Sequence, residues 1–129
     1  MIYVDSSVVL AQLLAEDLYP DSSFWTKGPL VSSRLVEYEV WTRINVRALT
    51  TSHGDDVRAL MGRLAFLELA PTVLKRALEP FPTPVRTLDA LHLASIDFLR
   101  SAGQRPLLAT YDHRLSQAAT AMEIQLAEI

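Results

Sequence analysis

Short apolar runs that alternate with longer helical stretches constrain the fold of this chain more than any other feature. Segments with apolar residues at helical spacing separate the runs, and parallel strands need crossovers of this kind. The alternation therefore predicts an α/β fold, a three-layer α/β/α domain with a central, mainly parallel sheet. The expected strands cover residues 2–4, 30–31, 66–70 and 107–110, with a last edge strand at 124–127.

Capping and helix-stopping residues predict where the helices begin and end. Ser6 or Ser7 can cap the first helix, Ser32 or Ser33 a long middle one, and Thr87 the helix that ends before Gly103. The tripeptide His53-Gly54-Asp55 predicts a turn. The expected helices cover approximately residues 8–14, 21–27, 34–49, 57–64, 71–78, 87–102 and 112–122.

The composition predicts a single domain without disulfides. A chain of 129 residues fits one compact domain, and we expect residues 1–129 to form it. The net charge of −3 gives no global attraction to nucleic acid, so RNA binding would need a local basic patch. The absence of cysteine excludes thiolate metal sites and fits a reducing compartment. Because 50% of the residues are hydrophobic, we expect a second buried surface, either a dimer interface or a groove for a partner helix.

The N-terminal sequence predicts neither export nor membrane insertion. No basic leader precedes the apolar run at residues 2–4, and Asp5 interrupts that run at once. No apolar stretch is long enough to span a bilayer. We therefore expect a cytoplasmic protein that does not bind a membrane.

Four acidic residues lie beside the segments that predict buried structure. Asp5 and Asp112 follow strand-like runs, Asp89 begins a helix, and Glu39 lies inside one. Carboxylates at such positions can share a crevice at the carboxyl edge of a parallel sheet. Two of them about 4 Å apart would repel by roughly 4 kcal/mol at an effective dielectric near 20. A bound divalent cation would remove this repulsion.

Each acid also has a purely structural interpretation. Asp5 and Asp112 can cap the helices that follow them, and Asp89 can interact with the helix dipole. Glu39 can pair with Arg43 one turn later. Its neighbour Glu37 lies about 200° away around the helix axis, so the two cannot face one site.

The residues around the four acids resemble the motifs of PIN-domain ribonucleases, especially the VapC-type toxins of type II toxin–antitoxin pairs. The third motif-like segment, residues 86–94, is the most distinctive of the set, and Glu39 takes the acid position of the second. Asp97 departs from the small residues usual in the family, but it lies outside the motif. The four similar segments follow the family order and cover residues 2–7, 33–40, 86–94 and 110–115.

The resemblance implies a metal-dependent endoribonuclease, a hydrolase of RNA phosphodiester bonds that a cognate antitoxin protein neutralises. It implies Mg²⁺ as the cofactor, with Mn²⁺ as a substitute, and we expect a homodimer. Oxygen ligands without cysteine agree with a hard cation. The expected metal ligands are Asp5, Asp89 and Asp112, and Glu39 would complete the catalytic acids by orienting or deprotonating the attacking water.

Other residues near these motifs have two interpretations each. His92 lies three residues after Asp89 and can touch the same site, but a packed, hydrogen-bonded histidine is the expected role. Ser6, Ser7 and Thr110 can donate hydrogen bonds to the acids or act only as caps. Three arginines can grip RNA phosphates or form a solvated face: Arg34, Arg43 and Arg47.

Three other functions compete with this interpretation. A receiver-like signalling domain needs a lysine near the acids, and the two lysines, Lys27 and Lys75, follow no acidic strand end. A non-catalytic PIN-like scaffold that binds RNA or protein would be indicated by the loss of one acid, yet all four are present. A nuclease for DNA flaps would need long insertions, which this chain lacks.

Overall fold

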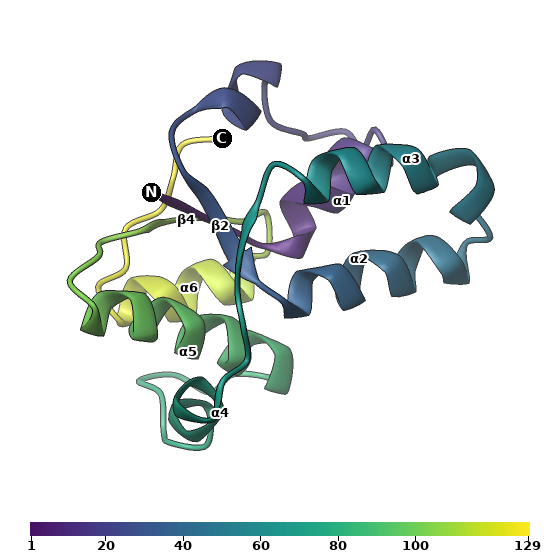
Figure 1. Ribbon diagram of the computed structural model, residues 1–129. Helices are drawn as coiled ribbons and strands as arrows, with labels where there is room; N and C mark the ends of the chain where they lie inside the picture. Colours follow the sequence, from purple (N-terminus) through teal and green to yellow (C-terminus); the bar gives the residue numbers. More distant parts are fainter.

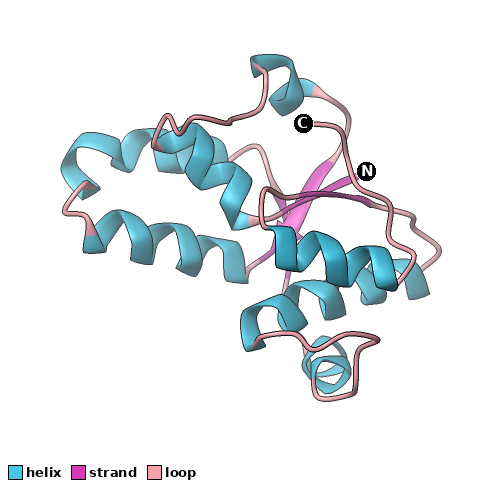
Figure 2. Ribbon diagram, turned by 180° about the vertical axis from the view of Figure 1, so that it is seen from behind, coloured by secondary structure: helices cyan, strands magenta, loops and turns pink.

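Four short parallel strands form the centre of the structure, a computed structural model that describes residues 1–129. The strand order across the sheet is β3-β2-β1-β4, so the N-terminal strand lies inside the sheet and contacts both β2 and β4. Helices lie on both sides of it (Figures 1 and 2). This arrangement confirms the predicted three-layer α/β/α fold. The strands are β1 (Ile2–Val4), β2 (Leu30–Ser33), β3 (Ala65–Leu67) and β4 (Leu107–Ala109).

Six α-helices and one 3₁₀ helix connect and cover the strands. Helix α4 packs closely against α5, while α3 packs against α1 and α2. None of the helices combines the length and the apolar character needed to cross a bilayer. The helices are α1 (Ser6–Leu13), η1 (Ser22–Thr26), α2 (Leu35–Val46), α3 (Thr50–Met61), α4 (Pro71–Ala77), α5 (Thr87–Ser101) and α6 (His113–Ala121).

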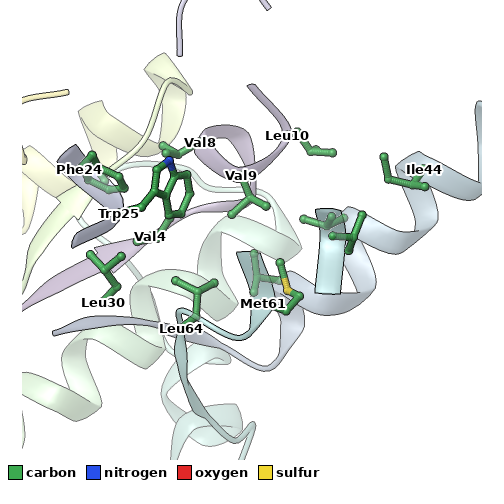
Figure 3. Close-up of a cluster of buried hydrophobic side chains, with 14 residues drawn as sticks. Val4, Val8, Val9, Leu10, Phe24, Trp25, Leu30, Ile44, Met61 and Leu64 are labelled. Carbon is green, nitrogen blue, oxygen red and sulfur yellow. The ribbon is translucent and has the colours of Figure 1, made fainter. Parts of the chain in front are cut away.

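Alternate side chains of the strands divide the core into two layers. Val4 joins the larger cluster, which includes η1 and helices α1, α2 and α3 (Figure 3). Its neighbour Tyr3 points to the opposite face and packs with Leu93 of α5 and Leu115 of α6. The period of two along a strand explains why adjacent residues enter different layers. Helices α2 and α5 therefore approach the sheet from opposite faces.

Several predicted boundaries are wrong. The tripeptide His53-Gly54-Asp55 is no turn but lies inside α3. Gly54, Val57 and Met61 form a buried stripe at helical spacing, and this packing outweighs the low helix propensity of glycine. The expected edge strand at 124–127 is reduced to a single bridge between Leu108 and Leu126.

The predicted caps are only partly correct. Asp5, rather than Ser6 or Ser7, caps α1, and its side chain accepts a hydrogen bond from the Ser7 N–H. Ser33 does accept one from the Leu35 N–H at the start of α2. Thr87 is the first helical residue of α5 rather than its cap, and no side chain caps that helix. The carboxylate of Asp5 is thus fixed by local structure at the point where β1 ends.

Candidate active site at the carboxyl edge of the sheet

The parallel pairing of β1 with β4 brings Asp5 and the segment after Ala109 together. The Asp5 N–H donates to the Ala109 carbonyl oxygen at 3.0 Å, which extends the ladder by one step. Both strands end at this edge of the sheet, where β1 leads into α1 and β4 leads toward α6. Residues about 105 positions apart in the sequence therefore become neighbours, as expected for the carboxyl ends of parallel strands.

Three donors hold one oxygen of the Asp5 carboxylate. Oδ2 accepts from the Ser7 hydroxyl at 2.7 Å, the Thr110 hydroxyl at 2.9 Å and the Ser7 N–H at 3.3 Å. The same hydroxyls accept hydrogen bonds from the N–H groups of Tyr111 and Asp112. Ser7 and Thr110 therefore donate hydrogen bonds to a site acid, which is one of the two roles predicted for them. Oδ1 of Asp5 carries fewer hydrogen bonds, since it accepts only a long one of 3.5 Å from the Ser6 hydroxyl.

Glu39 reaches this edge from α2, on the other side of the site. Its side chain is 15% exposed, and Oε1 lies 2.6 Å from Nε2 of His92. Glu37 points elsewhere and pairs with Arg34. Helix geometry had predicted this separation of the two glutamates. Arg43 makes no ion pair with Glu39, so the pairing predicted one turn along the helix is wrong.

His92 is packed and hydrogen-bonded as expected, but its partner belongs to the site. The side chain is 1% exposed, and its Nδ1 lies 2.7 Å from the Tyr3 hydroxyl while Nε2 meets Glu39. Burial opposes the charged ring, but Tyr3, the hydrogen bond to Glu39 and the Asp5 charge outweigh it and raise the pKa of His92 well above its usual value. One ligand atom from each of Asp5, Glu39 and His92 lies within 4.8 Å of the other two.

Asp89 and Asp112 line the same cleft but lie outside this closest group. The cleft has a volume of about 1150 Å³ and is also lined by Asp5 and Glu39. Oδ1 of Asp112 caps α6 by accepting from the N–H groups of Arg114 and Leu115. Burial, then the charges of Asp112 and Asp5, raise the pKa of Asp89 above its usual value. The structure therefore brings all four predicted acids to one cleft.

The donor set fits a hard divalent cation. Four carboxylates from four segments of the chain face one cleft, and cysteine is absent. Oxygen-rich sites of this kind suit Mg²⁺ and Mn²⁺ better than softer metals. Burial and then the neighbouring acids Asp112 and Asp5 raise the pKa of Asp89, and the charge of a cation would act against both effects.

Three arginines line the cleft without a carboxylate partner. They are Arg43 of α2, Arg86 before α5 and Arg114 of α6. Of the arginines proposed from the sequence, only Arg43 is among them. Arg47 lies outside the cleft, and Arg34 is paired with Glu37 and Glu68. The cleft therefore holds three cationic side chains beside its acids.

Comparison with known proteins identifies the family. The PIN domain family matches residues 2–121. The chain belongs to this family. This PIN domain is 31% identical over 130 residues to Ribonuclease VapC35 of Mycobacterium tuberculosis (strain CDC 1551 / Oshkosh), covering 96% of the chain and 93% of that protein. It is also 36% identical over 127 residues to Ribonuclease VapC46 of M. tuberculosis (strain ATCC 25618 / H37Rv), covering 92% and 89%.

The sequence did not indicate the part that Tyr3 plays in this PIN domain. Tyr3 is a strand residue of the core, and nothing in its neighbours marks its hydroxyl as functional. The only signal for His92 is its spacing of three residues from Asp89 on one helix face. Arg86 and Arg114 adjoin the motif acids, yet only the cleft shows that they share it.

Proposed function

We propose that this chain is a metal-dependent endoribonuclease toxin that hydrolyses RNA phosphodiester bonds at the four-acid cleft. One observation carries the proposal: the folded PIN domain gathers Asp5, Glu39, Asp89 and Asp112, far apart in the sequence, around a single cleft. Two similar proteins named ribonucleases align along almost the whole chain. The raised pKa of Asp89 supports a site that is built to receive positive charge.

The residues divide into metal ligands and a water-activating group. Asp5, Asp89 and Asp112 would hold Mg²⁺, with Mn²⁺ as a substitute, directly or through water. When bound, the metal polarises the phosphodiester and stabilises the charge that develops on its oxygens. Glu39 would orient the attacking water and accept its proton, and in-line displacement would leave 5′-phosphate and 3′-hydroxyl ends.

The arginines of the cleft would hold the RNA backbone. An acidic ring repels phosphate groups, so that substrate binding needs cations beside it. Arg43, Arg86 and Arg114 come from three different elements around the acids and have no carboxylate partner. Guanidinium groups bind phosphate oxygens in a bidentate way. They would fix the position of the scissile bond without reading its sequence.

The proposal includes a protein partner. A cognate antitoxin would neutralise the activity in the cytoplasm, and the toxin would act as a homodimer. Exposed apolar side chains support such contacts, among them Tyr38 and Val46 of α2, Leu74 of α4 and Leu78 directly after it.

Cleavage assays with single-charge variants test the activity. Purified protein with Mn²⁺ is expected to cut RNA, and Asp5→Asn or Asp89→Asn to lower the rate by about a hundredfold or more, because the metal supplies several kcal/mol. Asp55→Asn is the matched control, since Asp55 is an exposed acid on α3 that pairs only with Arg58. Sequencing of RNA 5′ ends after expression of the wild type and of Asp5→Asn would locate the cut sites.

Two results would refute the proposed activity. Cleavage that persists in excess EDTA would exclude the metal. RNA binding without any cleavage by the wild type would favour a non-catalytic scaffold.

A further inference from the structure

His92 lies between two layers of the domain and connects them. It is on α5, which covers the face of the sheet opposite to α2, the helix of Glu39 (Figure 1). Its ring packs edge-on against Tyr3 of the central strand β1, with the ring centroids 5.7 Å apart. The imidazole is 1% exposed, so no solvent molecule competes freely for its nitrogens. A buried polar ring of this kind needs a hydrogen-bond partner at each nitrogen.

Both ring nitrogens have one close partner. Nδ1 lies 2.7 Å from the Tyr3 hydroxyl, and Nε2 lies 2.6 Å from Oε1 of Glu39. The Glu39 carboxylate can only accept, so the hydrogen must be on Nε2. In the neutral ring the Tyr3 hydroxyl donates to Nδ1, and in the charged ring Nδ1 donates to the Tyr3 oxygen. The Nε2 hydrogen points at Glu39 in both forms.

Asp5 lies too far from His92 to share the Nε2 hydrogen with Glu39. Nε2 lies 3.7 Å from Oδ1 of Asp5, which is too far for a hydrogen bond. The geometry alone would let Asp5, Glu39 and His92 hold a cation together, because their atoms lie within 4.8 Å of one another. For that role Nε2 would have to lose its hydrogen and present its lone pair. Glu39 would then lose its donor in a site where its carboxylate is only 15% exposed.

We propose that His92 is a positioning residue that holds the Glu39 carboxylate in the cleft through its Nε2–H group, with Tyr3 fixing the ring from behind, and that it does not ligate the metal. This inference rests on the proposed ribonuclease function for the role of Glu39, but not for the hydrogen bonds. Histidine and carboxylate pairs commonly orient groups at metal sites from outside the ligand set. Here the histidine holds the acid in place, and Tyr3 acts through the histidine.

Nuclear magnetic resonance of the imidazole nitrogens tests the assignment without any need for activity. The full chain, labelled with ¹⁵N-histidine, is measured first in EDTA and then with Mg²⁺ alone at saturating concentration. The Nε2–H signal of His92 is expected to be hydrogen-bonded in EDTA and to persist with Mg²⁺. Loss of that hydrogen on addition of Mg²⁺, with Nε2 becoming unprotonated, would overturn the proposal. His53, which lies on α3 and outside the cleft, serves as the internal reference.

Variants separate positioning from ligation. His92→Leu is expected to lower kcat by about 10- to 100-fold, while His92→Gln, whose amide can donate to Glu39, recovers a large part of it. Tyr3→Phe should lower kcat without changing KM. Ile96→Val removes a methyl group from the same core cluster and controls for loosened packing. It is expected to leave kcat unchanged, and an equal loss of kcat there would make the role of Tyr3 merely structural.

Titration of Mn²⁺ against each variant gives the deciding comparison. The Kd for Mn²⁺ is expected to change by less than about tenfold in His92→Gln, and to rise well beyond that in Asp5→Asn. An equal rise in the two variants would identify His92 as a ligand and overturn the proposal. If the wild type cut no RNA, the proposed function would fail, while the resonance and the Mn²⁺ titration would still decide the place of His92.

Discussion

Two buried tyrosine hydroxyls give a matched test of the hydrogen bonding behind the site. The hydroxyl of Tyr3 is fully buried and bonds to His92 at 2.7 Å. The hydroxyl oxygen of Tyr111 is also buried, but it has no hydrogen-bond partner. Tyr3→Phe and Tyr111→Phe remove the same atom and change the unfolded chain in the same way. The difference between the two variants therefore reports the Tyr3–His92 hydrogen bond.

The size of the stability difference follows from whether each substitution leaves a buried polar group without a hydrogen-bond partner. Tyr3→Phe leaves Nδ1 of a 1% exposed histidine without its partner, which costs about 2 kcal/mol in the free energy of unfolding. Tyr111→Phe removes a buried oxygen that makes no bond, so the free energy of unfolding is expected to stay the same or to rise slightly. The two variants should thus differ by about 2 kcal/mol, with Tyr3→Phe the less stable.

Urea unfolding in EDTA measures this difference without a metal contribution. At a slope of about 2 kcal/mol per molar urea, the unfolding midpoint of Tyr3→Phe is expected to fall by about 1 M. In thermal unfolding, 1 kcal/mol corresponds to about 4 °C for a chain of this size. Equal midpoints for the two variants would refute the reasoning, because the hydrogen bond to His92 would then contribute nothing to stability. A changed slope for one variant alone would point to an effect on the unfolded state instead.

Three further predictions concern the cleft. Arg43→Ala should weaken RNA binding and reduce the salt dependence of log K by about 0.7, whereas Arg47→Ala, at the C-cap of α2 and outside the cleft, should change it less. RNA-binding titrations at several salt concentrations would show this difference, and equal effects would count against RNA binding along the cleft. Burial and neighbouring acids raise the pKa of Asp89, so protons compete with Mn²⁺ for this carboxylate and the Mn²⁺ affinity should fall as the pH falls through that pKa. Calorimetry over a pH series should show a shallower pH dependence of the affinity for Asp89→Asn, and an unchanged pH dependence would exclude Asp89 as the titrating group. Ser7→Ala removes the hydroxyl that donates to Asp5 at 2.7 Å and should raise the Kd for Mn²⁺ by about 10-fold or more. Ser52→Ala, which changes an exposed serine of α3, should leave the Kd unchanged. A Ser7→Ala protein with wild-type Mn²⁺ affinity would show that Asp5 does not need this hydrogen bond to bind the metal.

The main features of the fold could be predicted from local patterns. The alternation of apolar runs and helical stretches predicted a parallel sheet with helices on both faces, because the period of the apolar residues is a local property. The errors fell where tertiary packing decides. Helix α3 continues through Gly54 because the glycine is buried in line with Val57 and Met61. The edge strand expected at 124–127 makes a single bridge, between Leu108 of β4 and Leu126.

The candidate acids were also found from the sequence, together with the separation of Glu37 from Glu39. A strand end, a helix start and an angle of 200° between two helix positions are all fixed by a few neighbouring residues. The presence of Asp5 and Asp112 as helix caps did not conflict with their place in the cleft, since a cap uses one carboxylate oxygen and leaves the other.

The sequence by itself therefore determined the layered fold, the order of the motif segments and which four acids lie beside them. Only the tertiary structure decided how these acids are held. Tyr3 and His92 are 89 residues apart, and His92 and Glu39 are 53 residues apart. No periodicity connects such positions, because they meet only when α2 and α5 pack on opposite faces of one sheet. The hydrogen bond between His92 and Glu39, and the one from Thr110 to Asp5, are thus products of the packed domain, whereas Ser7 holds Asp5 locally.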